Sequence, residues 1–175
     1  MDIFAHTLWA NAAAKEANEA AAKKGKKFHI SPGWAAFWGV FPDFFAFGLP
    51  MLISAPVLFR EGFHFGPHSH SDLAANLYQY SHSLVIWAAV FLIVWAIYRR
   101  PRWELLGWAL HILIDIPSHG ASFYPTPFLF PISDYRFLHG VSWANPIYMM
   151  INYSALSAVY LYYLLRKKKA KVMTT

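Results

Sequence analysis

The chain has 175 residues, a length that suits a single domain over residues 1–175. Hydrophobic residues make up 57% of it and aromatic residues 19%, but only 14% are charged, against about 25% in an ordinary soluble domain. There is no cysteine, so disulfides and thiolate–metal sites are excluded. This composition favours an integral membrane protein.

The net charge of +6 is unevenly placed, because Lys and Arg gather in three short runs that each adjoin an apolar segment: residues 23–27, 99–102 and 166–169. Nucleic-acid binding would favour a basic stripe on a soluble fold. Basic runs beside apolar segments are instead typical of membrane topology signals and of contacts with anionic lipids. We therefore expect membrane lipids as partners and no nucleic acid, and the oligomeric state stays open.

In chain order, residues 2–22 predict an amphipathic helix that lies on the membrane surface or caps the bundle. The apolar stretch 30–59 contains Pro42, Pro50 and Pro56. Because proline interrupts helical hydrogen bonding, this stretch predicts two short helices that meet near Pro42-Asp43. The other segments are a polar, His-rich loop, two apolar helices, a proline-containing loop and a last apolar helix: residues 60–81, 82–98, 103–116, 117–140 and 145–165.

These segments predict an all-α integral membrane helix bundle, with about four apolar segments plus the N-terminal amphipathic helix. The positive-inside rule places the basic runs in the cytoplasm, so both termini are expected there, in a membrane such as the bacterial inner membrane. Loops 60–81 and 117–144 are then expected outside. Residues 1–6 lack the basic start of a signal peptide, so insertion is expected to use the internal segments.

The strongest local signal is His111-Ile112-Leu113-Ile114-Asp115. Residues four apart lie on one helix face, so the imidazole and the carboxylate can point at one metal ion. His119 follows at another four, and because Pro117 intervenes we expect it just past the helix end, turned back toward the site. The alternative is a core histidine with an aspartate that caps the helix.

Buried carboxylates add weight to the metal interpretation. An aspartate at the centre of a bilayer costs roughly 2.5–3.5 kcal/mol, and Asp43 and Asp115 both lie within or at the ends of apolar segments. Binding of a divalent ion can contribute a favourable free energy on the order of 10 kcal/mol, which would offset this cost. Asp43, in Phe41-Pro42-Asp43-Phe44, is either a ligand, a general base or a turn-forming residue.

Two further histidines are candidates. His82 opens an apolar segment, with Ser81 as a possible N-cap, and the four-segment topology places it at the same membrane face as Asp115. That coincidence favours one shared site over a simple polar helix start. His6, on the N-terminal helix, carries little meaning alone.

Other polar residues stay open in this interpretation. His64, His68, His70 and Asp72 form a cluster that can bind metal, but a solvated polar loop explains it equally well. The second outer loop offers Asp134 and His139 as outer ligands or substrate contacts, and His29 is expected to be an interface residue.

The ordered motifs resemble those of the YdjM-like membrane-bound metal-dependent hydrolases, across about residues 1–140. The motifs that carry the resemblance are His6, Pro42-Asp43, Ser81-His82-Ser83, His111-x-x-x-Asp115, and Tyr124-Pro125 with Phe130-Pro131-Ile132-Ser133-Asp134. One departure is Leu77-Tyr78-Gln79, which stands where that family often has His-Arg-Gly.

A more distant similarity is to zinc-dependent phospholipase C and the related zinc nucleases, helical proteins whose metals sit among His and Asp side chains of several helices. This likeness implies a metal pocket of His82, His111 and Asp115, with His6 on a second ion and Asp43 as base. That pattern has its later His farther from the Asp than His119 is from Asp115, and a further His-x-x-x-Glu pair that this chain lacks. One or two ions are therefore expected, not three.

The sequence thus predicts a membrane-bound metal-dependent hydrolase that acts on a phosphodiester- or ester-type, lipid-like substrate through a metal-activated water. Nitrogen and oxygen ligands favour zinc over manganese or iron. The expected ligands are His6, His82, His111, Asp115 and His119, with Asp43 as catalytic base. The alternative is a non-enzymatic membrane protein, either a metal-binding ion transporter or a structural helix bundle.

Overall fold

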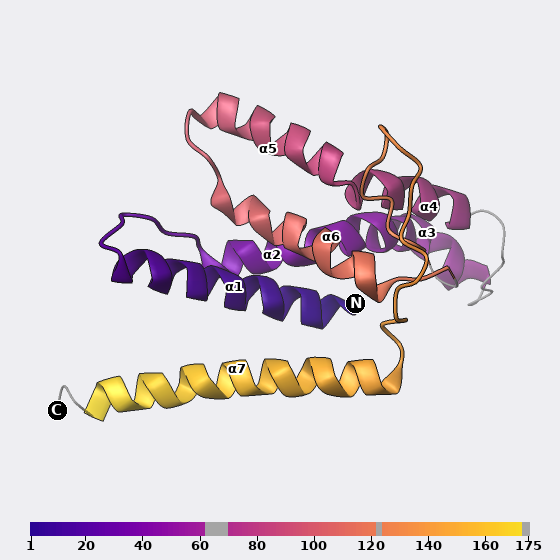
Figure 1. Cartoon of the computed structure of the whole chain (residues 1–175). Helices are drawn as coiled ribbons and strands as arrows, with labels where there is room; N and C mark the ends of the chain where they lie inside the picture. The colour runs from indigo at the N-terminus through magenta and orange to yellow at the C-terminus, as the bar shows by residue number, and fades with distance from the viewer. Residues whose placement is uncertain (62–69, 122–123, 173–175) are drawn as a thin grey trace.

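The structure is a computed structural model that describes residues 1–61, 70–121 and 124–172. Over these ranges the regular secondary structure is helical, and the β-type pairing found there is one isolated bridge between Gly120 and His139, so the all-α prediction is confirmed. The α-helices are α1 Ile3–Lys23, α2 Pro32–Asp43, α3 Leu49–Glu61, α4 His70–Ser81, α5 Leu84–Tyr98, α6 Leu106–Ser118 and α7 Pro146–Val172 (Figure 1).

Helix α1 begins at Asp2, whose side chain accepts a hydrogen bond from the Ala5 N–H at 3.1 Å and so satisfies one of the unpaired donors of the first turn. Its buried face consists of His6 and small alanines. Small residues let helices approach closely, and a Cβ added to Gly39 of α2 would lie 2.6 Å from the Ala10 Cβ. Helix α1 therefore packs along α2 (Figure 1).

Helix α6 completes this tightly packed core. A Cβ added to Gly107 would lie only 2.1 Å from the Ala35 carbonyl oxygen of α2, so the two backbones touch at this point. Leu105, just before α6, and Trp108 and Ile112 on it are buried against aromatic side chains of α2 and α5. The close contact of α1, α2 and α6 fixes the positions of the polar side chains that these helices carry.

The prediction of two helices that meet near Pro42-Asp43 is confirmed in part, because α2 ends at Asp43, but the chain stays helical through this point and does not break. A π-helical segment, Phe44–Gly48, joins α2 to α3, and the Leu49 N–H bonds to the Phe44 carbonyl five residues earlier. Pro50 offers no N–H to the carbonyl four residues before it, so the hydrogen-bond ladder widens just ahead of that proline. Single π turns of this kind are frequent at functional sites.

The helical stretch Pro32–Ala55, 24 residues, is long and apolar enough to cross a membrane, and it is the only single helix of this kind within the described ranges. The pair Asp72–Ser81 and Leu84–Tyr98 meets the same criteria jointly but is bent by 60°. Of the four expected membrane segments, the structure thus supplies one candidate span and one bent pair.

The basic runs lie together at one end of the molecule (Figure 1). Arg166 of α7 forms an ion pair with Glu19 of α1, and the rings of Phe28 and Trp103 are 5.7 Å apart. Met1, by contrast, lies at the other end of α1, whose 21 residues span about 31 Å. Helix α1 thus separates Met1 from the basic end, and the prediction that both termini are cytoplasmic stays a prediction.

Candidate metal centre

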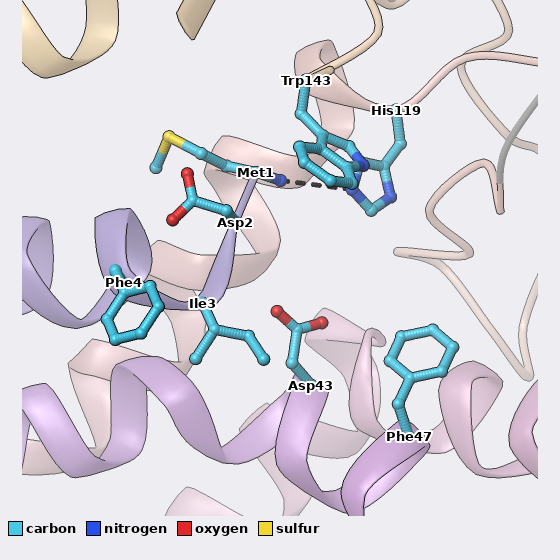
Figure 2. Close-up of a pocket in the computed structure, with 8 residues that line it drawn as sticks. All are labelled: Met1, Asp2, Ile3, Phe4, Asp43, Phe47, His119 and Trp143. Carbon is cyan, nitrogen blue, oxygen red and sulfur yellow. Dashed lines mark hydrogen bonds between the residues drawn. The ribbon is translucent and has the colours of Figure 1, made fainter.

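A cavity of about 310 Å³ opens where the start of α1 meets the end of α2. It is lined by the first four residues of the chain together with Asp43, Phe47, His119 and Trp143 (Figure 2). Two of the expected site residues, Asp43 and His119, thus face one cavity although 76 positions separate them in the chain. His82, His111 and Asp115 do not line the cavity and lie next to Asp43.

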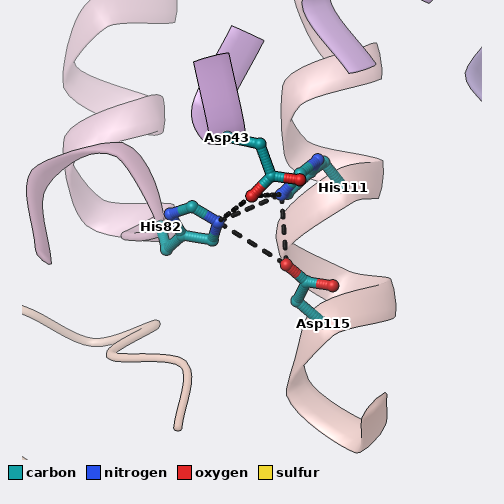
Figure 3. A group of neighbouring side chains, drawn as sticks. All are labelled: Asp43, His82, His111 and Asp115. Carbon is teal, nitrogen blue, oxygen red and sulfur yellow. Dashed lines mark hydrogen bonds and ion pairs between the residues drawn. The ribbon is translucent and has the colours of Figure 1, made fainter. Parts of the chain in front are cut away.

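Four buried side chains converge at this point: Asp43, His82, His111 and Asp115 (Figure 3). Asp43 ends α2, His82 lies at the break between α4 and α5, and His111 and Asp115 share one face of α6. One ligand atom from each lies within 4.8 Å of all the others. The expected spacing on α6 and the shared location of His82 and Asp115 are both present.

The tautomers of the two histidines follow from their outer partners. His111 Nδ1 lies 2.7 Å from the Gly39 carbonyl oxygen, which can only accept, so Nδ1 donates and Nε2 keeps a lone pair. His82 Nδ1 lies 2.9 Å from Ser81 Oγ, and that hydroxyl can donate to the Tyr78 carbonyl 3.5 Å away. The His111 Nε2 lone pair therefore points inward. The His82 Nε2 lone pair does the same when Nδ1 carries the proton and donates to Ser81 Oγ, a hydrogen bond typical of metal-binding histidines.

The inward-pointing atoms match the spacing that a tetrahedral metal requires. Zinc bonds of about 2.0–2.1 Å to nitrogen or oxygen give ligand–ligand separations of about 3.3 Å. His111 Nε2 lies 3.1 Å from both His82 Nε2 and Asp115 Oδ2, and 3.7 Å from Asp43 Oδ1. His82 Nε2 lies 3.5 Å from each carboxylate. Two lone pairs and two carboxylates this close repel one another unless a metal ion or a proton lies between them.

The second oxygen of Asp115 faces a different set of nitrogens. Asp115 Oδ1 lies 2.9 Å from His6 Nε2, 3.6 Å from His119 Nε2 and 2.5 Å from the Met1 amino group. Neither ring nitrogen of His6 has a hydrogen bond of acceptable geometry, although the ring is fully enclosed. The short distance to Asp115 is therefore a close approach and not a hydrogen bond. Asp115 stands as a carboxylate between two groups of nitrogen atoms.

His6 and His119 lie beside the four-residue group, not within it. The His6 ring stacks on His111 with centroids 3.6 Å apart. Burial, and then the neighbouring His111, lower the pKa of His6 to about 4, and burial lowers the pKa of His119 to about 4. Both rings are therefore neutral at pH 7, the form in which an imidazole binds metal.

Tyr78 is a site residue that the sequence interpretation missed. Its hydroxyl lies 2.9 Å from His119 Nδ1 and donates to the Tyr124 carbonyl at 2.8 Å, while its ring stacks on His82 with centroids 3.8 Å apart. One side chain thus positions two histidines. The signal was available, because Tyr78 precedes His82 by four residues and so shares its helix face.

The other candidates do not join the site. Asp72, Asp134, His139 and His29 are exposed. His64 and His68 lie outside the described residues, as does the side chain of His70.

No protein-family model, curated protein or solved structure matches this chain. The function of the site must therefore be argued from its own geometry.

Proposed function

We propose that this chain is a membrane-embedded, metal-dependent hydrolase of the YdjM-like type. The observation that carries the proposal is the convergence of two inward-facing imidazole lone pairs and two carboxylates at zinc-like separations. A buried polar group costs free energy unless it is paired, and a divalent cation pairs all four at once. The absence of cysteine favours zinc bound by nitrogen and oxygen ligands.

One ion would be held by Asp43, His82, His111 and Asp115. A second position is supported at Asp115 Oδ1, which His6 and His119 approach with neutral rings. A carboxylate shared in this way is consistent with paired ions about 3.5–4 Å apart. Outer hydrogen bonds from Gly39, Ser81 and Tyr78 fix the rings before any ion binds.

A bound zinc ion would supply a Lewis acid that lowers the pKa of water to about 7 and neutralises charge on an acyl or phosphoryl oxygen. Asp43 is the member of the four-residue group that also lines the cavity. Its carboxylate is therefore placed to orient an incoming water and to accept its proton. His119 borders the same cavity and can contact the substrate.

Membrane insertion is supported by the apolar surface of the outer helices. Helix α5 has no buried residue, and its exposed side chains include Leu92, Ile93 and Ile97. Helix α7 likewise exposes Ile147 and Met150, 68% and 70% accessible. Large exposed apolar patches mark membrane or partner surfaces, and these extend over several sides of the molecule.

The basic end then faces the cytoplasm by the positive-inside rule. Asp43 lies eleven residues after Pro32, about 16 Å along the candidate span from that end. The proposed site is thus near the middle of the bilayer. Because α1 runs from the site toward the basic end (Figure 1), His6 reaches the site although the basic run that follows it faces the cytoplasm.

The test is the metal content of detergent-purified protein by elemental mass spectrometry. Wild type should carry near-stoichiometric zinc, and folded His111→Ala and Asp115→Asn variants should lose it. His29→Ala is the matched control, since His29 is exposed, and it should retain the metal. Zinc-loaded protein should then hydrolyse a phosphodiester or ester substrate. Wild type that is metal-free after chelator-free purification would refute the proposal.

A non-enzymatic helix bundle is the second candidate, and one observation favours it. His82 Nε2 lies 3.5 Å from Asp43 and from Asp115, so a protonated ring could pair with both carboxylates without any metal. Such a centre would stabilise the bundle or pass protons. It predicts no bound metal and a stability that the Asp115→Asn substitution lowers.

A further inference from the structure

The cavity beside the candidate metal centre is lined by both polar and apolar side chains. Asp2, Asp43 and His119 supply polar groups, and the last two lie next to the converging ligands (Figure 2). Ile3, Phe47 and Trp143 supply apolar walls. Polar groups beside apolar walls match a molecule with a polar head and a hydrocarbon tail.

The mouth of the cavity lies on an apolar surface. Phe4 and Ile3 line the cavity and are still 74% and 46% exposed. Phe44, on the first turn after α2, is 53% exposed. In a membrane-embedded chain, exposed apolar side chains face lipid tails and not water. The mouth would then open sideways, toward the bilayer.

We propose that this cavity takes up one hydrocarbon chain of a membrane lipid, directly from the bilayer. The chain lies against Ile3, Phe4 and Phe47, and the ester or phosphodiester head lies at Asp43 and His119. This assignment of a substrate class rests on the proposed hydrolase function, although occupation of the cavity by a chain does not need the metal. A volume of about 310 Å³ is at the lower limit for ligand pockets and suits one chain, not two.

A small polar substrate fits this cavity less well. It would displace water from the apolar walls of Phe47 and Trp143 without placing apolar surface against them, and burial of apolar surface is the main source of affinity in such pockets. It would also enter past exposed Phe4. A lipid chain would bury apolar surface against the cavity walls and would also pass the apolar entrance without loss of hydration.

The test uses the full-length protein in phosphatidylcholine bilayers containing a lysophospholipid with a photoreactive diazirine near the end of its chain. Adducts are mapped by mass spectrometry, with and without zinc. We expect adducts on Phe47 and Trp143, and competition by unlabelled lysophospholipid but not by glycerophosphocholine. Ile3→Trp, which fills the cavity, should abolish them. Met51→Trp, an exposed position on α3 that does not line the cavity, should retain them.

Adducts confined to outward-facing positions, or unchanged on Phe47 and Trp143 in Ile3→Trp, would overturn the inference. If Ile3→Trp does not fold, the competition experiment on wild type decides the same question. The two proposals fail separately. Cavity adducts in a protein that binds no metal would refute the hydrolase proposal and support the lipid pocket. Bound zinc without cavity adducts would support the metal centre and refute the lipid pocket.

Discussion

The two serines that flank His82 provide the sharpest test of the metal centre. Ser81 Oγ lies 2.9 Å from His82 Nδ1, and in the proposed metal-binding tautomer it accepts the Nδ1 proton and holds the Nε2 lone pair toward the other ligands. In Ser81→Ala the ring loses that partner. The proton can then occupy Nε2, where it blocks metal binding, and the ring can also rotate.

The expected effect follows from what is lost. Removing the outer partner of a metal-binding histidine weakens metal affinity about 10–100-fold, which corresponds to about 1.4–2.7 kcal/mol. The unpaired, fully buried His82 Nδ1 also costs about 1–3 kcal/mol of folding free energy. Ser81→Ala should therefore lose both zinc affinity and stability, while its fold and its other ligands stay in place.

Ser83→Ala is the matched control. Ser83 is as buried as Ser81 but faces away from the ligands, because its Oγ caps α5 by accepting from the N–H groups of Val85 and Ile86 and donates to the Phe130 carbonyl. Loss of an N-cap costs about 1 kcal/mol. This variant should therefore lose stability but bind zinc like wild type.

The assay is a competition titration of zinc against a chromophoric chelator, with thermal unfolding of each protein measured in the same detergent. The discriminating quantity is affinity, since both substitutions lower stability. Equal zinc affinity in Ser81→Ala and wild type would refute the assigned tautomer. An equal loss in Ser81→Ala and Ser83→Ala would show that affinity merely follows stability.

Three further predictions concern packing, topology and pH. Gly107→Ala should destabilise the protein by about 1–3 kcal/mol in denaturant unfolding because of the backbone clash, whereas Gly33→Ala, with open space around it, should be neutral or slightly stabilising. In this cysteine-free chain, Lys26→Cys and Asp134→Cys should react with an impermeant maleimide from opposite sides of the membrane, and labelling from one side would exclude the topology. Metal-free protein should lose stability as pH falls from about 6.5 to 4, by about 3 kcal/mol from His6 alone. The folded-state pKa of His6 is lowered, so the unfolded chain binds the proton first, and a flat profile over this range would contradict the burial argument.

The residues of the site were more predictable than their surroundings. The four-residue spacing of His111 and Asp115 is a local property of a helix, so it could be read from the sequence. The proximity of His82 to Asp115 was predicted from the order of the apolar segments. Whether Asp43 acts as ligand or base could not be read, because both roles need a carboxylate at the same place.

The packing of α1 could not be predicted from local patterns. Its Ala10 looks like an ordinary helix-forming residue, and its significance appears only when Gly39 stands opposite it in space. The same holds for the helix through Pro42, where sequence favours a break. The π turn at Phe44–Gly48, just ahead of Pro50, is likewise not visible in local sequence patterns.

The number of bound ions predicts the charge of the substrate. Asp43 and Asp115 together carry two negative charges and the adjacent Met1 amino group one positive charge, so one divalent ion leaves an excess of one positive charge. A second ion at Asp115 Oδ1, in place of the amino group, would raise the excess to two, which favours an anionic phosphodiester over a neutral ester more strongly. We therefore expect the zinc-to-protein ratio to match the preferred substrate, measured with paired lipid esters and phosphodiesters of equal chain length. Two ions with a clear preference for the neutral ester would contradict this electrostatic reasoning.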